Sequence, residues 1–388
     1  MNVYAQALEK HKEWRGKVEI ISKATVKNSA DLSLAYSPGV AAPCREIAEN
    51  PERVWDYTWK GNTIAVVSDG TAVLGLGNIG PAAALPVMEG KAVLFKEFAN
   101  VNAIPLCLNT QDVDEIVQIV KSLEPTIAGV NLEDISAPRC FEIERRLKEE
   151  TNMFVFHDDQ HGTAVVTLAG LINALKVVGK DKDAVIVVNG IGAAGAAIVL
   201  TLLEDGYKNI IPCGRHGRLI PGDPANNPCQ EEIAQATNPE GIKQTLAEAM
   251  RGADVFIGVS VANVVTPEMV KGMNDQPIIM ALANPEPEIS VELALEAGAA
   301  VVATGRSDYP NQINNVLGFP GIFRGALDVR ATELNCAMKI AAAHAIAGLI
   351  PEPTAECIIP SPFDSRVVPA VAQAVADAAR KTGAAREV

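Results

Sequence analysis

The stretch AVIVVNGIGAAGAAIVLTLLE, residues 184–204, decides the fold of this chain. Its first part (VIVV) is typical of a buried strand, and its second part is a long helical pattern without proline. The glycines between the two parts have the spacing GxGxxG. A turn of this kind that follows a strand directly and opens a helix is typical of a dinucleotide-binding unit. We expect the cofactor to contact this turn at Gly190, Gly192, Ala193, Ala194 and Gly195.

The same stretch is apolar enough, and long enough, to be mistaken for a membrane-spanning helix. Asn189 and the three glycines divide it into a strand-like half and a helix-like half, and a spanning helix would not need that division. The N-terminal segment MNVYAQALEKHKEWRGK is charged and lacks the apolar core of a signal peptide. We therefore expect a soluble protein with no membrane partner.

The composition excludes some partners and favours one compartment. Of the 388 residues, 48% are apolar and 21% charged, which allows two domains with substantial cores. A net charge of −14 argues against nucleic acid and anionic membranes, because both favour basic patches. The seven cysteines include no CxxC pair, which predicts free thiols and a cytoplasmic location.

Strand-like and helical runs alternate along most of the chain. The strand-like runs include TIAVVSD, KAVLFKEF, IPLCLNT and MFVFHDD, and alternation of this kind predicts parallel sheets with crossover helices. We expect an α/β protein with a substrate and metal domain over residues 1–161 and a doubly wound Rossmann-type domain over 162–388. An amphipathic helix at about 363–384 should pack back on the N-terminal domain or on a partner subunit.

The second strand of the cofactor unit ends in CGRHGR, which favours NADP over NAD. An NAD-binding protein usually has a carboxylate there for the ribose 2′-hydroxyl. Here Gly214 takes that place and is followed by Arg215, His216 and Arg218, whose positive charge suits a 2′-phosphate. An ordinary solvated loop is the alternative, and NAD remains possible.

A second GxGxxG, formed by Gly75, Gly77 and Gly80, is a weaker match. Several residues separate it from the preceding strand, and Pro81 and Pro86 interrupt the segment that follows. We interpret it as a tight turn that shapes the substrate pocket, although Glu97, twenty residues after Gly77, keeps a cofactor role open.

Two acidic pairs, Glu133-Asp134 and Asp158-Asp159, each follow a strand-like apolar run. Carboxyl ends of parallel strands share one edge of a sheet, where ligands bind. Four carboxylates gathered there would repel one another unless a cation neutralised them, and Mg²⁺ or Mn²⁺ suits such oxygen ligands. Capping of the next helix is the alternative for one pair alone. Two pairs favour a divalent metal site.

Several motifs together resemble the malic enzymes, in particular their short, bacterial, metal-dependent type. The resemblance runs in order from about residue 30 to about residue 330. Its motifs are AYSPGVAAPC, SDGTAVLGLGNIG, MEGKAVLF, NLEDISAP, FHDDQHGTA, ALANPEPEI and PNQINNVLGFPG. The resemblance implies oxidation and decarboxylation of malate to pyruvate with NADP or NAD, a divalent metal, and a homodimer.

The same resemblance implies roles for individual residues. Tyr36 would be the general acid and Lys91 the general base, kept neutral by burial and a nearby cation. Asp158 would lie beside the lysine and take part in catalysis. The metal ligands would be Glu133, Asp134 and Asp159. Substrate and nicotinamide ribose would be held by Lys91, Asn284, Asn314 and Asn315.

One motif departs from the family pattern, and other functions stay open. The larger animal-type enzymes carry an arginine where Thr71 and Ala72 follow Asp69-Gly70, so another group must contact the substrate carboxylate here. A malolactic enzyme would use the same site with bound NAD to make lactate. An amino-acid dehydrogenase would need no acidic cluster, and an inactive nucleotide-binding regulator would need neither Tyr36 nor Lys91.

Overall fold

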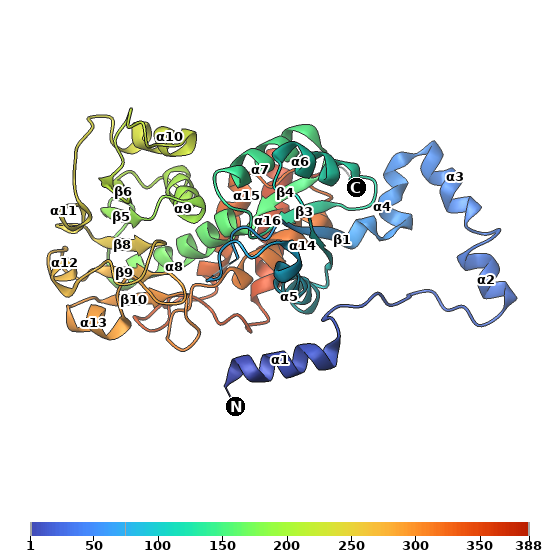
Figure 1. Ribbon diagram of the computed structural model, residues 1–388, viewed down its shortest axis with the longest axis horizontal. Coiled ribbons are helices and arrows are strands. Elements are labelled where there is room, and N and C mark those ends of the chain that lie inside the picture. Colours follow the sequence, from blue (N-terminus) through green and yellow to red (C-terminus); the bar gives the residue numbers. More distant parts are fainter. Residues whose placement is uncertain (1, 74, 387–388) are drawn as a thin grey trace.

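Two β-sheets form the body of the chain in the computed structural model, which describes residues 2–73 and 75–386 (Figure 1). The first sheet is parallel throughout and has the strand order β2-β1-β3-β4, so that all four carboxyl ends lie at one edge. Its strands are β1 (Thr63–Ser68), β2 (Asn102–Cys107), β3 (Gly129–Leu132) and β4 (Phe154–His157).

Helices cover both faces of the first sheet because its strands are apolar on both sides. Ile64 and Val66 of β1 belong to a core shared with α5 and the C-terminal helices, whereas Ala65 and Val67 pack with α6 and α7. These helices are α5 (Pro81–Ala99), α6 (Val113–Ser122) and α7 (Arg139–Glu150).

The second sheet has the order β10-β9-β8-β5-β6-β7, in which only the β6–β7 pair is antiparallel. The chain passes outward from β5 in both directions, as expected for a doubly wound fold. Its strands are β5 (Ile186–Asn189), β6 (Ile210–Gly214), β7 (Gly217–Arg218), β8 (Val255–Gly258), β9 (Ile278–Ala281) and β10 (Val301–Thr304). Its helices are α9 (Ala193–Glu204), α10 (Pro228–Thr237), α11 (Leu246–Met250), α12 (Pro267–Lys271) and α13 (Val291–Glu296).

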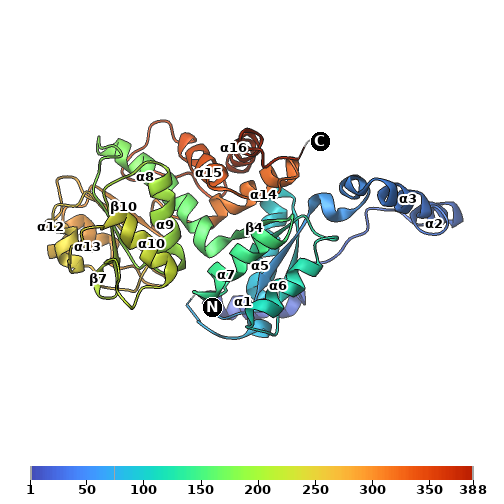
Figure 2. The ribbon, with the colours of Figure 1, turned by 90° about the horizontal axis from the view of Figure 1, so that it is seen from above.

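The chain crosses between the sheets on α8 (Thr163–Val177) and returns to the first sheet through its C-terminal helices (Figure 2). Phe95 of α5 packs edge-on against Phe319 and Phe323, with ring centroids 4.7 and 4.9 Å away. The expected terminal helix is observed against the preceding two and beside the N-terminal sheet. The returning helices are α14 (Phe319–Asp328), α15 (Cys336–Gly348) and α16 (Val367–Thr382).

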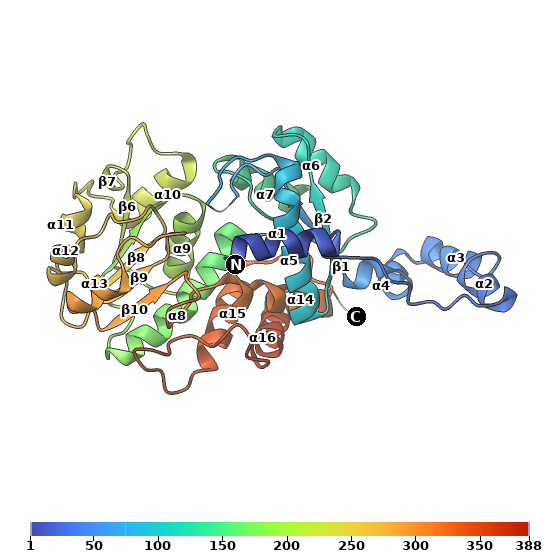
Figure 3. The same cartoon turned by 60° about the horizontal axis from the view of Figure 1, so that its bottom comes forward.

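The first fifty residues lie outside the two sheets. The helix α1 (Val3–Trp14) lies beside α5 (Figure 3), where Lys17 donates hydrogen bonds to Glu89 and to the carbonyl of Pro86. The segment that follows projects from the body as an arm and carries α2 (Ser29–Ala35) and α3 (Ala41–Glu49) (Figures 1 and 3). None of these three helices contains a buried residue. The arm joins the body through two 3-10 turns and a short helix, η1 (Pro51–Arg53), α4 (Val54–Tyr57) and η2 (Trp59–Asn62), immediately before β1.

One expected strand is wrong. The run KAVLFKEF is the second half of α5, which begins at Pro81 directly after Gly80. Proline suits the first turn of a helix because its missing N–H is not needed there. The buried residues of α5 recur at helical spacing, and this packing overrides the strand-like composition. No helix among the described residues is long and apolar enough to cross a membrane.

Candidate metal and dinucleotide site

Glu133, Asp134 and Asp159 meet at the carboxyl edge of the first sheet. Each offers a carboxylate oxygen within 4.8 Å of the others. They are brought together because β3 and β4 are neighbours and end side by side, just before these residues. Asn131 of β3 donates a hydrogen bond of 2.8 Å to Glu133 and so holds one of its oxygens in place.

The backbone of Asp134 completes the cluster. Its φ of +55° lies in the left-handed region, which residues other than glycine, asparagine and aspartate rarely adopt. This conformation lets the Asp134 N–H donate to Asp159 Oδ2 at 2.9 Å. Asp134 Oδ2 is buried and has no hydrogen-bond partner among the described residues. A buried oxygen without a partner is costly, and a bound cation would satisfy it.

The three carboxyls have strongly raised pKa values. Burial, with repulsion from neighbouring carboxylates, raises the pKa of Glu133 to about 8 and those of Asp134 and Asp159 to about 7. Such values show that the cluster lacks enough positive charge to neutralise itself. These oxygens therefore fit a hard dication such as Mg²⁺ or Mn²⁺, which would leave positions open for substrate.

Lys91 lies beside the acidic cluster on α5. Its Nζ is 2.6 Å from Asp158 Oδ2 and 3.0 Å from Glu133 Oε1, and it stands 4.1 Å from the ring centroid of Phe319. Asn315 donates a hydrogen bond of 3.0 Å to the same oxygen of Asp158. Ion pair, amide and ring together fix the amine at the edge of the candidate metal site.

Lys91 was expected to be a neutral amine, but its pKa is raised in the metal-free protein. Burial lowers this pKa, but the charges of Asp158 and Glu133 outweigh the burial and raise it overall. Without a cation, the lysine is therefore protonated. The prediction of a neutral Lys91 depended on a nearby cation. The carboxylates around Lys91 explain this dependence, because only a cation that offsets their charge would let the amine lose its proton.

The second glycine turn has the geometry of a dinucleotide site. It joins β5 directly to α9, and its N-cap, Gly192, provides no side-chain hydrogen bond, so the first N–H groups of the helix are available to a ligand. A Cβ on Gly195 would lie 2.0 Å from the carbonyl oxygen of Gly190, whereas one on Gly192 would meet nothing within 4 Å. Gly195 permits tight packing, and Gly192 leaves open space where the predicted pyrophosphate would approach.

Arg215, His216 and Arg218 follow β6, and the first two are available to a ligand. Arg218 donates to Gln244 and to the carbonyl of Thr237, so it serves the fold. Arg215 and His216 are exposed, and neither makes a hydrogen bond or ion pair to a described residue.

The three predicted binding asparagines lie in different places: Asn314 and Asn315 on the side of the acidic cluster, and Asn284 at the second sheet. Asn315 reaches Asp158, as described above, while Asn314 accepts a hydrogen bond from the Val316 N–H and caps η4 (Asn315–Leu317). Asn284 follows the carboxyl end of β9 and is exposed there. The structure therefore joins Asn315 to the acidic cluster, and it places Asn284 at the ligand edge of the second sheet.

Tyr36 is not near the acidic cluster in a single chain. It ends α2 on the projecting arm, and 68% of its surface is exposed. The other expected catalytic residues, Lys91 and Asp158, are in contact.

Several contributors were not predicted. Arg139 donates to Asp69 at 2.7 Å and to Thr71 at 2.9 Å, so a guanidinium does stand beside the position where larger relatives have their arginine. His161, two residues after Asp159, lies 2.7 Å from Glu144 and fixes the π-turn that carries that ligand. Arg139 and His161 could have been found from the sequence, because they lie within the motifs NLEDISAPR and FHDDQHG, and Asp69 and Thr71 lie within SDGTA.

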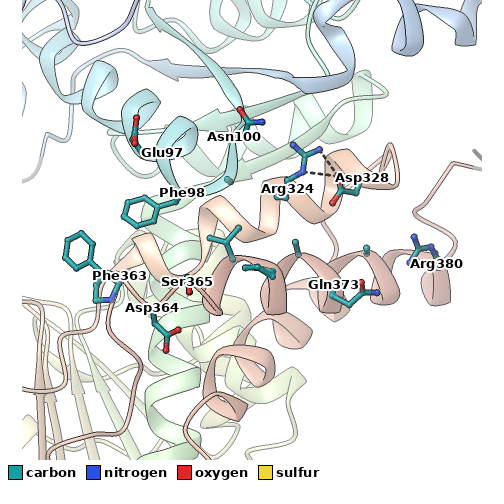
Figure 4. A pocket seen from close by; sticks show the side chains of 16 residues that line it. Glu97, Phe98, Asn100, Arg324, Asp328, Phe363, Asp364, Ser365, Gln373 and Arg380 are labelled. Carbon is teal, nitrogen blue, oxygen red and sulfur yellow. Dashed lines mark hydrogen bonds and ion pairs between the residues drawn. The ribbon is translucent and has the colours of Figure 1, made fainter.

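One pocket lies away from both the acidic cluster and the glycine turn. It has a volume of about 740 Å³ and is formed by the end of α5 with α14 and α16 (Figure 4). Phe98 and Phe363 stand at one end of it, and the Arg324–Asp328 ion pair lies along its wall. None of the acidic ligands or glycine-turn residues lines it, so we assign it no part in the site.

Comparison with known families gives a match over most of the chain. Residues 15–148 match the malic enzyme N-terminal domain, and residues 160–380 match the malic enzyme NAD binding domain. These two ranges contain the site residues described above except Asp158 and Asp159, which lie between them.

Relatives of high identity carry names of the same kind. The bifunctional malic/malolactic enzyme of Bacillus subtilis is 60% identical, over 100% of this chain and 95% of its own length. The NADP-dependent malic enzyme of Rhizobium meliloti is 51% identical, over 98% of this chain but 53% of its own length. The crystal structure of the NAD-dependent malic enzyme of Thermotoga maritima has a TM-score of 0.92 and 52% identity, covering 95% of this chain and 98% of that chain.

Proposed function

This chain belongs to the malic enzyme family, and we propose that it converts (S)-malate to pyruvate and CO₂ while reducing NADP, with a divalent metal required. The observation that carries the proposal is the contact of Lys91 with Asp158 and Glu133 beside three clustered carboxylates. A nucleotide-binding regulator would have no use for this arrangement, and an amino-acid dehydrogenase would not need the acidic cluster.

Each group has a defined task in this proposal. Glu133, Asp134 and Asp159 would hold Mg²⁺ or Mn²⁺, which would orient the substrate and polarise its C2 oxygen. Lys91 would accept the proton of the C2 hydroxyl, and its contact with Asp158 holds the amine in place for that step. The second glycine turn would hold the pyrophosphate of the dinucleotide, which would supply the acceptor for the hydride of C2.

Loss of CO₂ then leaves the enol form of pyruvate, which needs one proton at C3. Tyr36 would supply that proton as the general acid. The exposed side chains of Arg215 and His216 support NADP as the preferred cofactor, because both can donate hydrogen bonds to a 2′-phosphate. The relatives include both NAD- and NADP-dependent enzymes, so the preference belongs to this proposal.

The direct test is an assay of malate with each cofactor, before and after chelation. We expect NADPH and pyruvate to appear in equal amounts, activity to vanish with chelator, and Mn²⁺ or Mg²⁺ to restore it. Full activity in metal-free buffer would contradict the proposal.

A malolactic reaction is the second candidate, because the Bacillus subtilis relative is named for both activities. It would give lactate from malate without net formation of NADPH. Measuring lactate and NADPH in the same reaction separates the two. The seven free cysteines support a reducing compartment such as the cytoplasm for either activity.

A further inference from the structure

Glu288 is a buried carboxylate at the ligand edge of the second sheet, and the proposed reaction gives it no task. Its exposed fraction is 0%. One of its oxygens accepts from the backbone N–H of Ser260 at 2.7 Å and from the Ser260 hydroxyl at 3.1 Å. The other oxygen accepts from the N–H of Ala283 at 3.1 Å. Within the described part of the chain, no lysine or arginine forms an ion pair with it.

The three hydrogen bonds suit an ionised carboxylate. Each oxygen of Glu288 faces an N–H group, so a proton on either oxygen would compete with a donor that is already there. Burial raises the pKa of Glu288, and the hydrogen bonds from Ser260 and Ala283 oppose that shift. A buried negative charge without a cation is costly, so its presence points to a use beyond packing.

Glu288 joins loops that border the second glycine turn. Ser260 follows β8 and Ala283 follows β9, and these two strands are neighbours in the sheet. The loop after β8 also supports the turn itself. Asn189 of β5 donates to the Ser260 hydroxyl at 2.9 Å, and a Cβ on Gly190 would lie 2.9 Å from the Cβ of Ser260. One carboxylate therefore fixes the loops of β8 and β9 against the turn that follows β5.

The last residue of β8 makes room for this carboxylate. A Cβ on Gly258 would lie 2.4 Å from the carboxyl carbon of Glu288 and 2.6 Å from one of its oxygens. Gly258 is not among the residues of positive φ, so its backbone conformation would accept another residue. The close approach of Glu288 explains this glycine, as is common for a glycine inside a strand.

The two loops lie on the side of the sheet opposite the predicted 2′-phosphate contacts. A doubly wound sheet binds a dinucleotide across the point where its strand order reverses, with one mononucleotide on each half. Here the order reverses between β5 and β8, and Arg215 and His216 follow β6 on one side of that point. The loops after β8 and β9 lie on the other side, where the nicotinamide half of the cofactor would bind.

We infer that Glu288 is a positioning residue for the nicotinamide half of the cofactor, because it holds the loops after β8 and β9 in the shape that receives this half. The inference rests on the proposed function, since it takes the second glycine turn as the dinucleotide site. The carboxylate is covered by protein, so it acts through Ser260 and Ala283. Asn284 directly follows Ala283 and is exposed at this edge, so the same contact sets its place.

Binding measurements without malate test this role. Glu288→Gln keeps the size of the side chain, but an amide has one acceptor oxygen, so either the Ser260 N–H or the Ala283 N–H loses its partner. We expect the Kd for NADPH in a fluorescence titration to rise about tenfold. The Kd for adenosine 2′,5′-bisphosphate, which carries the 2′-phosphate but no nicotinamide, should not change in titration calorimetry.

Glu292→Gln is the matched control, because it makes the same substitution on the exposed surface of α13 and should change neither Kd. Ser260→Ala is a second variant that keeps the decision independent of a folding defect at Glu288. It removes the hydroxyl and keeps the backbone N–H, so it should weaken NADPH binding by a smaller factor and leave the bisphosphate unaffected. Unchanged NADPH binding in both variants, or equal weakening of NADPH and the bisphosphate, would overturn the inference.

The same measurements separate this inference from the proposed reaction. A wild-type protein that binds NADPH but makes no pyruvate from malate would end the proposed function, while the comparison of Kd values would still decide the role of Glu288. A wild type that prefers NADH is compared with ADP in place of the bisphosphate. A wild type that binds neither dinucleotide would end both.

Discussion

Binding of Mn²⁺ to the metal-free protein should release protons at neutral pH. Metal ligands must be deprotonated, and the three candidate ligands are buried together with too little positive charge. The pKa of Glu133 is raised to about 8 and those of Asp134 and Asp159 to about 7, so all three hold protons at pH values where ordinary carboxyls do not.

The expected magnitude follows from these pKa values. At pH 7 a group of pKa 8 is about nine-tenths protonated and a group of pKa 7 is half protonated, so the cluster holds about two protons. At pH 9 it holds about 0.1. The sign follows directly, because protons compete with the metal. Near pH 7 the apparent association constant should rise about 100-fold for each unit of pH, and near pH 9 it should level off.

Titration calorimetry in buffers of different ionisation enthalpy measures the released protons directly. We expect about two protons per Mn²⁺ at pH 7 and almost none at pH 9. Asp134→Asn should release at least about half a proton fewer at pH 7, since the group that it removes is half protonated there and its charge also raises the pKa of Asp159. Release near zero at pH 7, or binding that does not change with pH, would show that these carboxyls are not the ligands.

Four variants test other parts of the account. Lys91→Ala should lower kcat by at least about 100-fold, with NADP binding by fluorescence titration unchanged; near-normal turnover would remove the base assignment. Arg215→Ala together with His216→Ala should raise the KM for NADP about tenfold but not that for NAD, and equal effects on both would argue against a 2′-phosphate contact. Gly195→Ala should abolish measurable cofactor binding, because its Cβ would collide with the turn, while far-ultraviolet circular dichroism stays unchanged. Phe323→Ala should lower the free energy of unfolding by about 3–5 kcal/mol in urea titrations, since it leaves a cavity among three aromatic rings, and a loss below about 1 kcal/mol would contradict that packing.

The doubly wound cofactor domain and the acidic edge could be predicted because their signals are local. The strand and helix around Gly190 are adjacent in sequence, so the turn between them can be recognised without knowing the rest of the fold. The two acidic pairs needed one further step, that both follow strands of one parallel sheet, and the β3–β4 pairing confirms it.

The remaining features depend on packing between distant parts of the chain. The run KAVLFKEF has the composition of a strand. It forms a helix because the apolar residues on one face of α5 pack against Phe319 and Phe323, which are far away in sequence. The ion pairs around Lys91 join residues far apart in sequence, so the direction of its pKa shift could not be predicted from a motif. The position of Tyr36 on a projecting arm could not be predicted either, because α2 has no buried residue whose pattern in the sequence would indicate its packing.

The central claim is that Glu133, Asp134 and Asp159 share one divalent cation beside Lys91. A crystal soaked in Mn²⁺ and measured at a wavelength where manganese scatters anomalously tests this most directly. We expect one anomalous peak in contact with carboxylate oxygens of all three residues. A peak elsewhere, or none at a manganese concentration that supports full activity, would contradict the claim.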